Sequence, residues 1–203
     1  MIMEQEEQGV IARRIGIFGG SFNPPHISHV LACHFALCSW PLDLIMVVPN
    51  YMHPFGKPLE PFERRYQMAC LAFRHLAPWV EVSRVEEAMG GTSYTVDTVR
   101  ALRKRHPDAQ FHMVIGSDIL NDAPRWKEFE EISETAPLLV VPRLILNAGE
   151  RNSIDGQSFF LPAMASSDLR ELLRLGEDPG AAIPQAVMDY IRGRGLYGYC
   201  TSD

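Results

Sequence analysis

The sequence predicts a single α/β domain with a doubly wound parallel sheet and helices on both of its faces. Short apolar runs alternate along the chain with segments of helical period, which is the pattern of consecutive β–α units. Marked turns at Gly19-Gly20, Pro49-Asn50 and Gly116-Ser117 each follow an apolar run. Because ligands of such sheets bind beyond the carboxyl ends of the strands, we expect the functional site near these turns.

The first half of the chain contains a tail and then alternating elements. Residues 1–12 are acidic and polar, and we expect a flexible N-terminal tail there, ahead of one domain over 13–203. The apolar run IGIF before Gly19-Gly20 indicates a buried strand, and the apolar residues after the turn recur at helical spacing. In order, we expect a strand ending at 20, a helix over 26–40, a strand over 41–50, a proline-rich loop over 51–61, a helix over 62–76 and a strand over 79–88.

The second half continues the same alternation. Thr92-Ser93 is expected to cap a helix whose last turns carry Lys and Arg, where the helix dipole favours cations. Gly176 is a stop signal for a later helix. In order, we expect that first helix to run to 106, a strand over 110–118, a helix over 125–136, a strand over 137–144, a polar loop over 147–157, a short strand over 159–164, a helix over 166–176, and a helix from 184 that frays into a glycine-rich tail near 198.

Composition narrows the classes of partner. The chain is 46% hydrophobic and 22% charged with a net charge of −6, so it has no global basic field that would collect nucleic acid. No apolar run is long enough to cross a membrane, and no signal peptide is visible. The four cysteines form no CxxC pair, which favours free thiols in a reduced cytoplasm; they are Cys33, Cys38, Cys70 and Cys200.

The stretch GIFGGSFNPPHISHV carries the clearest chemical pattern. Gly19 and Gly20 let the backbone turn tightly and approach a phosphate. His26 and His29 are three residues apart at the start of a helix, so both imidazoles share a face beside its positive end, where they can donate hydrogen bonds to phosphoryl oxygens. The stretch is neither a Walker loop nor GxGxxG. The alternative interpretation is a proline-started helix with surface histidines.

This stretch and four later ones resemble one family, the nicotinate (nicotinamide) mononucleotide adenylyltransferases of the nucleotidyltransferase α/β-phosphodiesterase superfamily. GGSFNPPHISH is similar to its motif G-G-[ST]-F-x-P-x-H-x-G-H. The resemblance implies a Rossmann-like fold and extends over most of the chain, through segments in the family's order: VPNYMHPFGKPLEPFERRYQM, GGTSYTVDTVRAL, VIGSDILNDAPRWKEFEEI and ASSDLRELL.

The resemblance implies adenylyl transfer in NAD biosynthesis. The phosphate of the mononucleotide displaces pyrophosphate from ATP, and because that phosphate is already an anion, positioning and charge neutralisation matter more than a protein base. ATP is thus expected as a substrate, with Mg²⁺ held mainly by phosphates and no protein metal ligand. The acid form, nicotinate mononucleotide, is the expected acceptor because TSYTVDT is most similar to the bacterial acid-specific branch; the product would be deamido-NAD.

The resemblance also implies roles for individual residues. His29 would stabilise charge on the α-phosphate, and His26 would bind the phosphates beside it. The other ATP-binding residues implied are Gly19, Gly20, Ser21, Phe22, Lys57, Gly116, Asp118, Ser166, Ser167 and Arg170, and those implied for the pyridine nucleotide are Asn50, Thr92, Tyr94 and Trp126.

Taken without the family, several of these residues have a plain structural interpretation. Lys57 could be a surface lysine, Asp118 a turn residue, Thr92 an N-cap and Trp126 core packing. The helix that begins near Ser166 could simply be capped, since Asp168 and Glu171 stand at capping-box spacing.

Two positions depart from the family motif. Ser28 replaces a glycine of the first helical turn, which places a side chain where nucleotide would lie, and Asp168 replaces a threonine, which adds a negative charge near a triphosphate. These departures keep two alternatives open: a degenerate, non-catalytic nucleotide-binding or sensor protein, and an adenylyltransferase of nicotinamide mononucleotide or pantetheine phosphate. Small molecules are the expected partners, and the sequence is compatible with a homo-oligomer.

Overall fold

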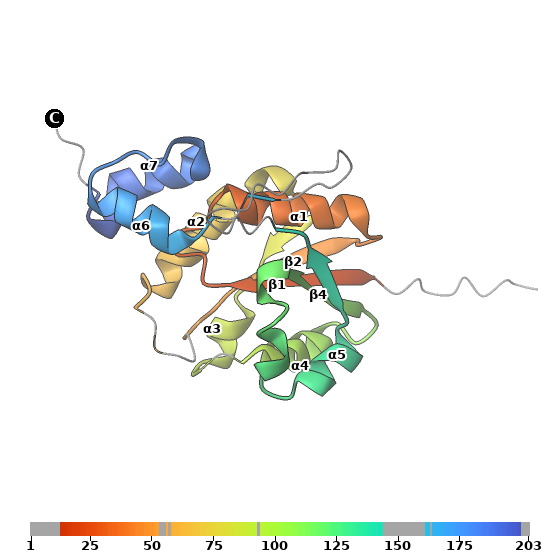
Figure 1. Ribbon diagram of the computed structural model, residues 1–203. Helices are drawn as coiled ribbons and strands as arrows, with labels where there is room; N and C mark the ends of the chain where they lie inside the picture. Colours follow the sequence, from red (N-terminus) through yellow and green to blue (C-terminus); the bar gives the residue numbers. More distant parts are fainter. Residues whose placement is uncertain are drawn as a thin grey trace, which may run out of the picture.

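The computed structural model describes residues 13–52, 56, 58–92, 94–143, 161–162 and 164–199. Its centre is a sheet of five parallel strands in the order β3-β2-β1-β4-β5 (Figure 1). This confirms the predicted α/β class and the parallel sheet. The strands are β1 Arg14–Gly20, β2 Leu44–Pro49, β3 Val80–Val82, β4 Gln110–Gly116 and β5 Leu138–Val141.

The order of the strands creates one switch point. The chain builds outward from β1 through β2 to β3, then returns to the other side of β1 to form β4 and β5. β1 is therefore flanked by β2 and β4, with Ile17 opposite Met46 on one side and Met113 on the other. Connections that start from β1 and β4 diverge to opposite sides, which leaves a crevice at their carboxyl ends.

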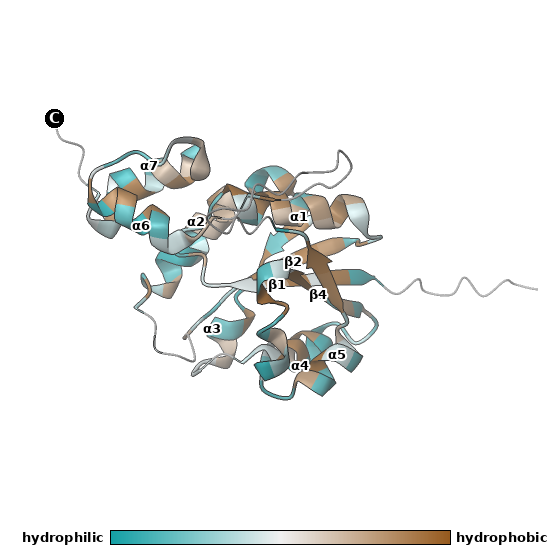
Figure 2. Ribbon diagram, in the orientation of Figure 1, coloured by the Kyte–Doolittle hydropathy of each residue, from teal (hydrophilic) through white to brown (hydrophobic). Residues whose placement is uncertain are grey.

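The sheet is buried on both faces. Side chains of a strand alternate between faces, so Ile45 and Val47 of β2 belong to one core while Leu44 and Met46 belong to the other. Figure 2 accordingly shows hydrophobic strands between helices with polar outer surfaces. The first core packs α1 Ile27–Ser39, α2 Phe62–Phe73, α6 Ser166–Arg174 and α7 Gln185–Arg194, and the second packs α3 Val85–Met89, α4 Thr95–Arg105 and α5 Phe129–Thr135.

Most predicted elements are confirmed to within a few residues, but the segment 79–88 is not one strand. Only Val80–Val82 pairs with β2, and the chain then forms the short helix α3 from Val85. Arg84, just before that helix, pairs with Glu87 inside it and with Glu63 of α2. These ion pairs and the acidic first turn favour a helix where apolar alternation predicted a strand.

The N-cap of α4 is not Thr92. Tyr94 occupies the N-cap position and its side chain makes no capping hydrogen bond, and Ser93 lies outside the described residues. Thr92 instead pairs with Met52 in an isolated parallel bridge, which places it outside the helix. The N-cap interpretation of Thr92 is therefore excluded, because its backbone belongs to a strand-like pairing.

The helix predicted over 125–136 is shorter than expected. A 3₁₀ turn, Ala123–Arg125, comes first, and Glu128 has a left-handed backbone with φ of 53°, so α5 begins only at Phe129. Trp126 consequently precedes the helix rather than starting it. Of the strand predicted over 159–164, Leu161 makes an isolated bridge to Arg143. The expected loop over 147–157 and the expected tail over 1–12 lie outside the described residues.

The C-terminal segment does not fray. Gly195, with φ of 58°, ends α7, and the 3₁₀ turn Leu196–Gly198 follows. Leu196 and Tyr199 are both buried in the first core. The glycines predicted a loose tail, but they serve here to turn the chain back onto the domain.

Two further expectations concern the environment of the chain. Cys33, Cys38 and Cys70 are free thiols, and Cys200 lies outside the described residues. No helix in the described ranges is long and apolar enough to span a membrane.

Candidate active site

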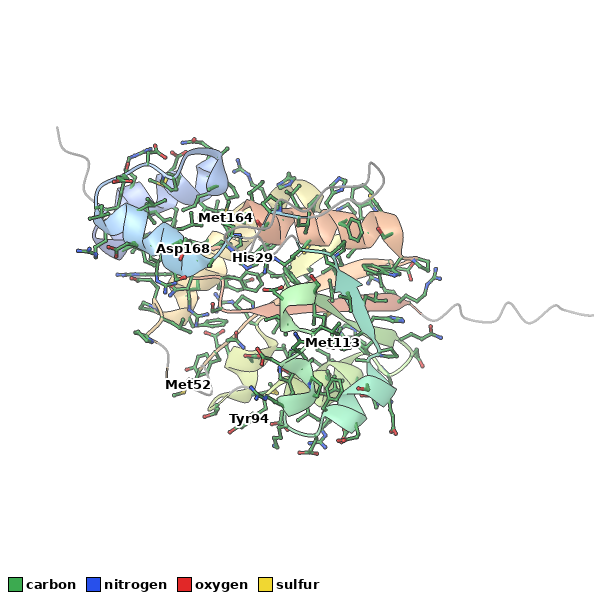
Figure 3. All side chains as sticks on the ribbon, viewed as in Figure 1. His29, Met52, Tyr94, Met113, Met164 and Asp168 are labelled. Carbon is green, nitrogen blue, oxygen red and sulfur yellow. The ribbon has the colours of Figure 1, made fainter. Side chains whose placement is uncertain are left out.

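The β1–α1 loop, residues 21–26, lies at the carboxyl end of β1, beside the switch point. The start of α6 packs against it, since Ser166 Oγ donates to the carbonyl of Pro24 (2.9 Å). In the view of Figure 3, His29 lies near Met164 and Asp168, which flank the beginning of α6. The structure therefore brings the two histidines, the glycine turn and the Ser166–Arg170 segment to one place, as the sequence predicts.

The imidazole rings of His26 and His29 pack against each other at an angle of 31°. Their ring centroids are 3.7 Å apart, and the backbone N–H of His26 donates to Nδ1 of His29 at 3.1 Å. Because Nδ1 of His29 accepts this bond, the proton of the neutral ring resides on Nε2. His29 therefore presents a fixed N–H donor on the edge of its ring away from the backbone.

Both imidazoles are held neutral. Burial, with the nearby Arg143 guanidinium as a second cause, lowers the pKa of His26 to about 4. The pKa of His29 also lies well below its usual range, because of burial first and then of the positive charges at His26 and Arg143. Near neutral pH the pair therefore supplies hydrogen-bond donors rather than cations.

Arg65 of α2 holds the loops around the site, a role that sequence reasoning missed. Its side chain is 1% exposed, and its guanidinium donates to four carbonyls. One is that of Ser21 in the β1–α1 loop (2.9 Å), and the others are those of Glu60, Asn50 and Tyr51, at 2.8, 2.7 and 3.3 Å. Since a peptide C=O and the following N–H point in opposite directions, the N–H of Phe22 faces away from Arg65.

Arg170 and Ser166 are at the site but already engaged. Arg170 donates to the carbonyl of Asn23 at 2.8 Å, and Ser166 donates to Pro24. Both side chains thus brace the β1–α1 loop, and Arg170 places a positive charge directly behind it. Ser167 donates to the exposed carboxylate of Asp168.

The capping-box interpretation of α6 is wrong. Ala165 occupies the N-cap position, and no side chain caps the helix. Glu171 pairs with Arg174 instead of reaching back to the helix start.

The glycine turn contains two different glycines. A Cβ on Gly20 would touch the ring of Phe22 at 3.2 Å, so this glycine allows Phe22 to pack closely. A Cβ on Gly19 would meet no atom of the described residues within 4 Å apart from its chain neighbours, so packing against these residues does not require a glycine there. Phe22 has φ of 46°, unusual for a bulky residue, and its side chain is fully buried, so only its backbone can face a ligand.

Gly116 and Asp118 meet a second missed residue, Arg143, which follows β5. The Asp118 carboxylate accepts from Arg143 at 2.8 Å, and Arg143 also donates to the carbonyl of Met164. A Cβ on Gly116 would lie 2.2 Å from Asp118 Oδ1 and 2.7 Å from Arg143 Cδ. The strand-ending glycine therefore permits the ion pair that borders the histidines.

The residues expected to bind the pyridine nucleotide do not come from the β1–α1 loop. They follow β2 or precede α4 and α5. The Asn50 N–H donates to the carbonyl of Gly20, and Met52 two residues later pairs with Thr92. Tyr94 is 39% exposed, and Lys127 Nζ lies 4.9 Å from the centre of its ring. Trp126 is half-buried against the second core, so core packing accounts for part of its ring. Lys57 lies outside the described residues.

Glu86 joins two segments of this side and was also missed. It is 4% exposed, accepts the backbone N–H of Tyr51 at 2.9 Å and accepts the hydroxyl of Thr98 at 2.9 Å. Arg65 holds the carbonyl of Tyr51 while Glu86 holds its N–H. Two buried charges of opposite sign therefore fix the chain just after β2, since Arg65 also holds the Asn50 carbonyl of the peptide whose N–H is that of Tyr51.

Ser28 is engaged within the fold. Its side chain is buried, and its hydroxyl donates to the carbonyl of Pro162 at 3.0 Å. The bond ties the first turn of α1 to the segment at 161–162.

Comparison with known proteins identifies the family to which this chain is similar. A model of the cytidylyltransferase-like family matches residues 17–170. A probable nicotinate-nucleotide adenylyltransferase of Myxococcus xanthus is 37% identical over 187 residues, which are 92% of this chain and 96% of that protein. One from Thermus thermophilus is 37% identical over 186 residues, 91% and 99% of the two chains.

The chain therefore belongs to the cytidylyltransferase-like family and, within it, to the nicotinate-nucleotide adenylyltransferases, a class of nucleotidyltransferase. Solved structures agree on the fold. A Plasmodium falciparum nicotinic acid mononucleotide adenylyltransferase complexed with NaAD has a TM-score of 0.72 at 22% identity, covering 93% of this chain and 98% of that one. A putative nicotinate-nucleotide adenylyltransferase from Vibrio parahaemolyticus gives 0.68 at 22% identity, with 94% and 98% covered. The predicted family is confirmed.

Proposed function

We propose that this chain transfers the adenylyl group of ATP to nicotinate mononucleotide, giving deamido-NAD and pyrophosphate in NAD biosynthesis. The observation that carries the proposal is the contact between His26 and His29 beyond the carboxyl end of β1, with the Nε2 proton of His29 fixed as a donor. The family membership names the reaction class, and the pair supplies what that class needs at the α-phosphate.

In this mechanism the mononucleotide phosphate attacks the α-phosphorus of ATP and pyrophosphate leaves. His29 donates to an α-phosphate oxygen as negative charge grows there, and His26 binds the neighbouring phosphate. The Phe22 N–H, turned away from Arg65, and the open space beside Gly19 fit a triphosphate lying along the β1–α1 loop. Neither step needs a proton to be removed, so no carboxylate base is required.

Mg²⁺ fits this site as a companion of the nucleotide. The described part of the chain contains no group of three or more His, Cys, Asp or Glu that could hold a metal ion. Phosphate and water oxygens suit Mg²⁺, so the triphosphate would hold it, and Asp168 adds an exposed carboxylate in the first turn of α6. Bound there, the ion would neutralise charge on the leaving pyrophosphate.

The acceptor would occupy the side formed by Asn50, Thr92, Tyr94 and Trp126. Tyr94 and Trp126 supply rings that can stack on a flat cationic pyridinium. Asp118, held by Arg143, is placed at the end of β4 for ribose hydroxyls of ATP. The remaining roles expected for Ser167 and Lys57 stay part of this proposal. Since ATP is the substrate and the described cysteines are free thiols, we assign the protein to the cytoplasm.

The non-catalytic alternative has less support in this geometry. Its arguments were Ser28 and Asp168, but Ser28 bonds to Pro162 and Asp168 is exposed at the helix surface. Both histidines and Arg170 are in place.

The test uses purified protein with ATP and Mg²⁺, offered nicotinate mononucleotide, nicotinamide mononucleotide or pantetheine phosphate in parallel. Pyrophosphate release and the product itself are measured. We expect deamido-NAD as the fastest product. Absence of product with both pyridine mononucleotides at millimolar concentration would contradict the proposal. Faster turnover with pantetheine phosphate would identify that compound as the acceptor instead.

A further inference from the structure

The C-terminal turn reaches into the site through Tyr197. This residue lies inside the 3₁₀ turn Leu196–Gly198 and has φ of 59°, a left-handed conformation that a tyrosine seldom adopts. Its neighbours Leu196 and Tyr199 are buried in the first core. Packing on both sides therefore holds a backbone conformation that directs the Tyr197 ring inward.

The inward ring ends on Asn23 of the β1–α1 loop, 174 residues away in sequence. Tyr197 Oη lies 2.9 Å from Asn23 Oδ1, and the same oxygen accepts the backbone N–H of Glu60 at 3.2 Å. A backbone N–H can only donate, so the atom of Asn23 facing both groups is the oxygen, and Tyr197 must be the donor. Burial raises the pKa of Tyr197, which keeps this phenol protonated.

Asn23 is the point at which three parts of the fold meet the loop. Its side chain is 1% exposed, its side-chain oxygen joins it to Tyr197 and to Glu60 before α2, and its carbonyl accepts from Arg170 of α6. Three residues later the chain reaches His26, whose N–H orients His29. A shift of Asn23 would therefore move the histidine pair relative to the phosphates.

We propose that Tyr197 is a positioning residue for adenylyl transfer, acting through Asn23 to fix the β1–α1 loop. This rests on the proposed function. The hydroxyl touches no reacting atom. It completes the set of donors behind the loop, together with Arg65, Arg170 and Ser166, and it is the one contributed by the last turn of the described chain.

The test compares Tyr197→Phe with Tyr190→Phe. Both substitutions remove one hydroxyl, but Tyr190 is half-buried on α7, its ring contacts Arg194, and its hydroxyl makes no hydrogen bond to the described residues. We expect Tyr197→Phe to lower kcat at least about 10-fold, while the KM for nicotinate mononucleotide stays within about twofold. Tyr190→Phe should behave as the unchanged protein.

A double-mutant cycle separates positioning from simple packing. If Tyr197 acts through Asn23, adding Tyr197→Phe to Asn23→Ala costs little further kcat, whereas independent effects would multiply. Amide exchange of the peptide covering residues 16–30 gives a readout without turnover, and it should be faster in Tyr197→Phe than in Tyr190→Phe. A kcat within about twofold of the unchanged protein, multiplicative effects, or unchanged exchange overturns the proposal.

The exchange measurement also separates this proposal from the proposed function. If the unchanged protein makes no dinucleotide, the proposed function fails. The positioning role in transfer then falls with it, while faster loop exchange in Tyr197→Phe would retain only the structural link between Tyr197 and the loop. If the unchanged protein is active and Tyr197→Phe matches it, the positioning role alone fails.

Discussion

The β1–α1 loop and the pyridine side of the site differ in how they are held. The loop is buried, and its carbonyls are occupied by Arg65, Arg170 and Ser166. The pyridine side, which we propose to consist of Asn50, Thr92, Tyr94 and Trp126, is half-buried or exposed. It is supported at its surface by an ion-pair network in which Arg100 bonds to Glu128 and Glu131 and Lys127 lies near Asp97.

The difference follows from what each side has to do. Charge stabilisation at a phosphorus requires donors fixed in advance, because reorganisation during the reaction would consume the benefit. Binding of a flat ring requires surface and orientation, which partly exposed aromatic side chains supply. We therefore expect substitutions behind the loop to lower kcat and substitutions on the pyridine side to raise the KM of the acceptor.

The largest expected effect is that of His29→Ala. It removes the donor at the α-phosphate, so kcat should fall by about 10²–10³-fold, while the KM for ATP changes little. His34→Ala, on an exposed position of the same helix, is the control and should leave kcat unchanged. Steady-state kinetics with both substrates varied makes the measurement. A near-normal kcat in His29→Ala would remove the role assigned to this residue.

Gly116→Ala tests the ion pair beside the histidines. The new Cβ would lie 2.2 Å from Asp118 Oδ1, so Asp118 and Arg143 must move apart. We expect a loss of about 1–3 kcal/mol in the free energy of unfolding, as in other overpacked sites, together with a higher KM for ATP. Urea unfolding and kinetics check both parts.

Gly193→Ala on α7 is the matched control for that substitution. Its Cβ would meet no atom within 4 Å, so alanine should stabilise that helix by about 0.5–1 kcal/mol. If both substitutions changed the free energy of unfolding equally, the crowding at Gly116 would have no effect on stability.

The lowered pKa of His26 predicts a pH dependence of stability. An unfolded histidine titrates near 6.5 and His26 in the folded protein near 4, so the unfolded chain binds more protons as pH falls between them. The contribution of His26 to the free energy of unfolding is therefore fully present above pH 6.5 and is lost as the pH falls toward 4. From pH 7 to pH 5 we expect His26 to account for a loss of about 2 kcal/mol.

Urea unfolding at the two pH values measures this loss. His26→Gln should reduce the dependence, leaving the part due to His29, whose pKa is also lowered, whereas His75→Gln, at an exposed position, should leave it unchanged. A full pH dependence in His26→Gln would mean that other groups cause it. The result would also test whether the neutral state of the pair is a consequence of burial.

Local features of the site could be predicted from the sequence, whereas its long-range contacts could not. The strand, the glycine turn and the HxxH spacing are local, so the β1–α1 unit and the placement of both histidines at the start of α1 could be predicted. Arg65, Arg143 and Tyr197 act through partners that are 44, 25 and 174 residues away, namely Ser21, Asp118 and Asn23. Sequence spacing carries no information on such contacts.

Errors in the element predictions have a similar origin. Alternating apolar residues over 79–88 predicted one strand because periodicity does not register the Arg84 ion pairs that favour a helix from Val85. Glycines near the C-terminus predicted fraying, although Leu196 and Tyr199 are buried there. In both cases tertiary contacts outweigh the local signal.

Lys127→Met should have the smallest effect, and only on the pyridine side. Lys127 Nζ lies 4.9 Å from the centre of the Tyr94 ring, at a partly exposed position. Losing one exposed cation–π contact should let Tyr94 move and raise the KM for nicotinate mononucleotide about 2–5-fold, with kcat and the KM for ATP unchanged. Lys104→Met removes the same charge from the exposed last turn of α4 and should change none of these constants. A drop in kcat for Lys127→Met would mean that the two sides of the site are coupled, because a residue of the pyridine side would then control the transfer step itself.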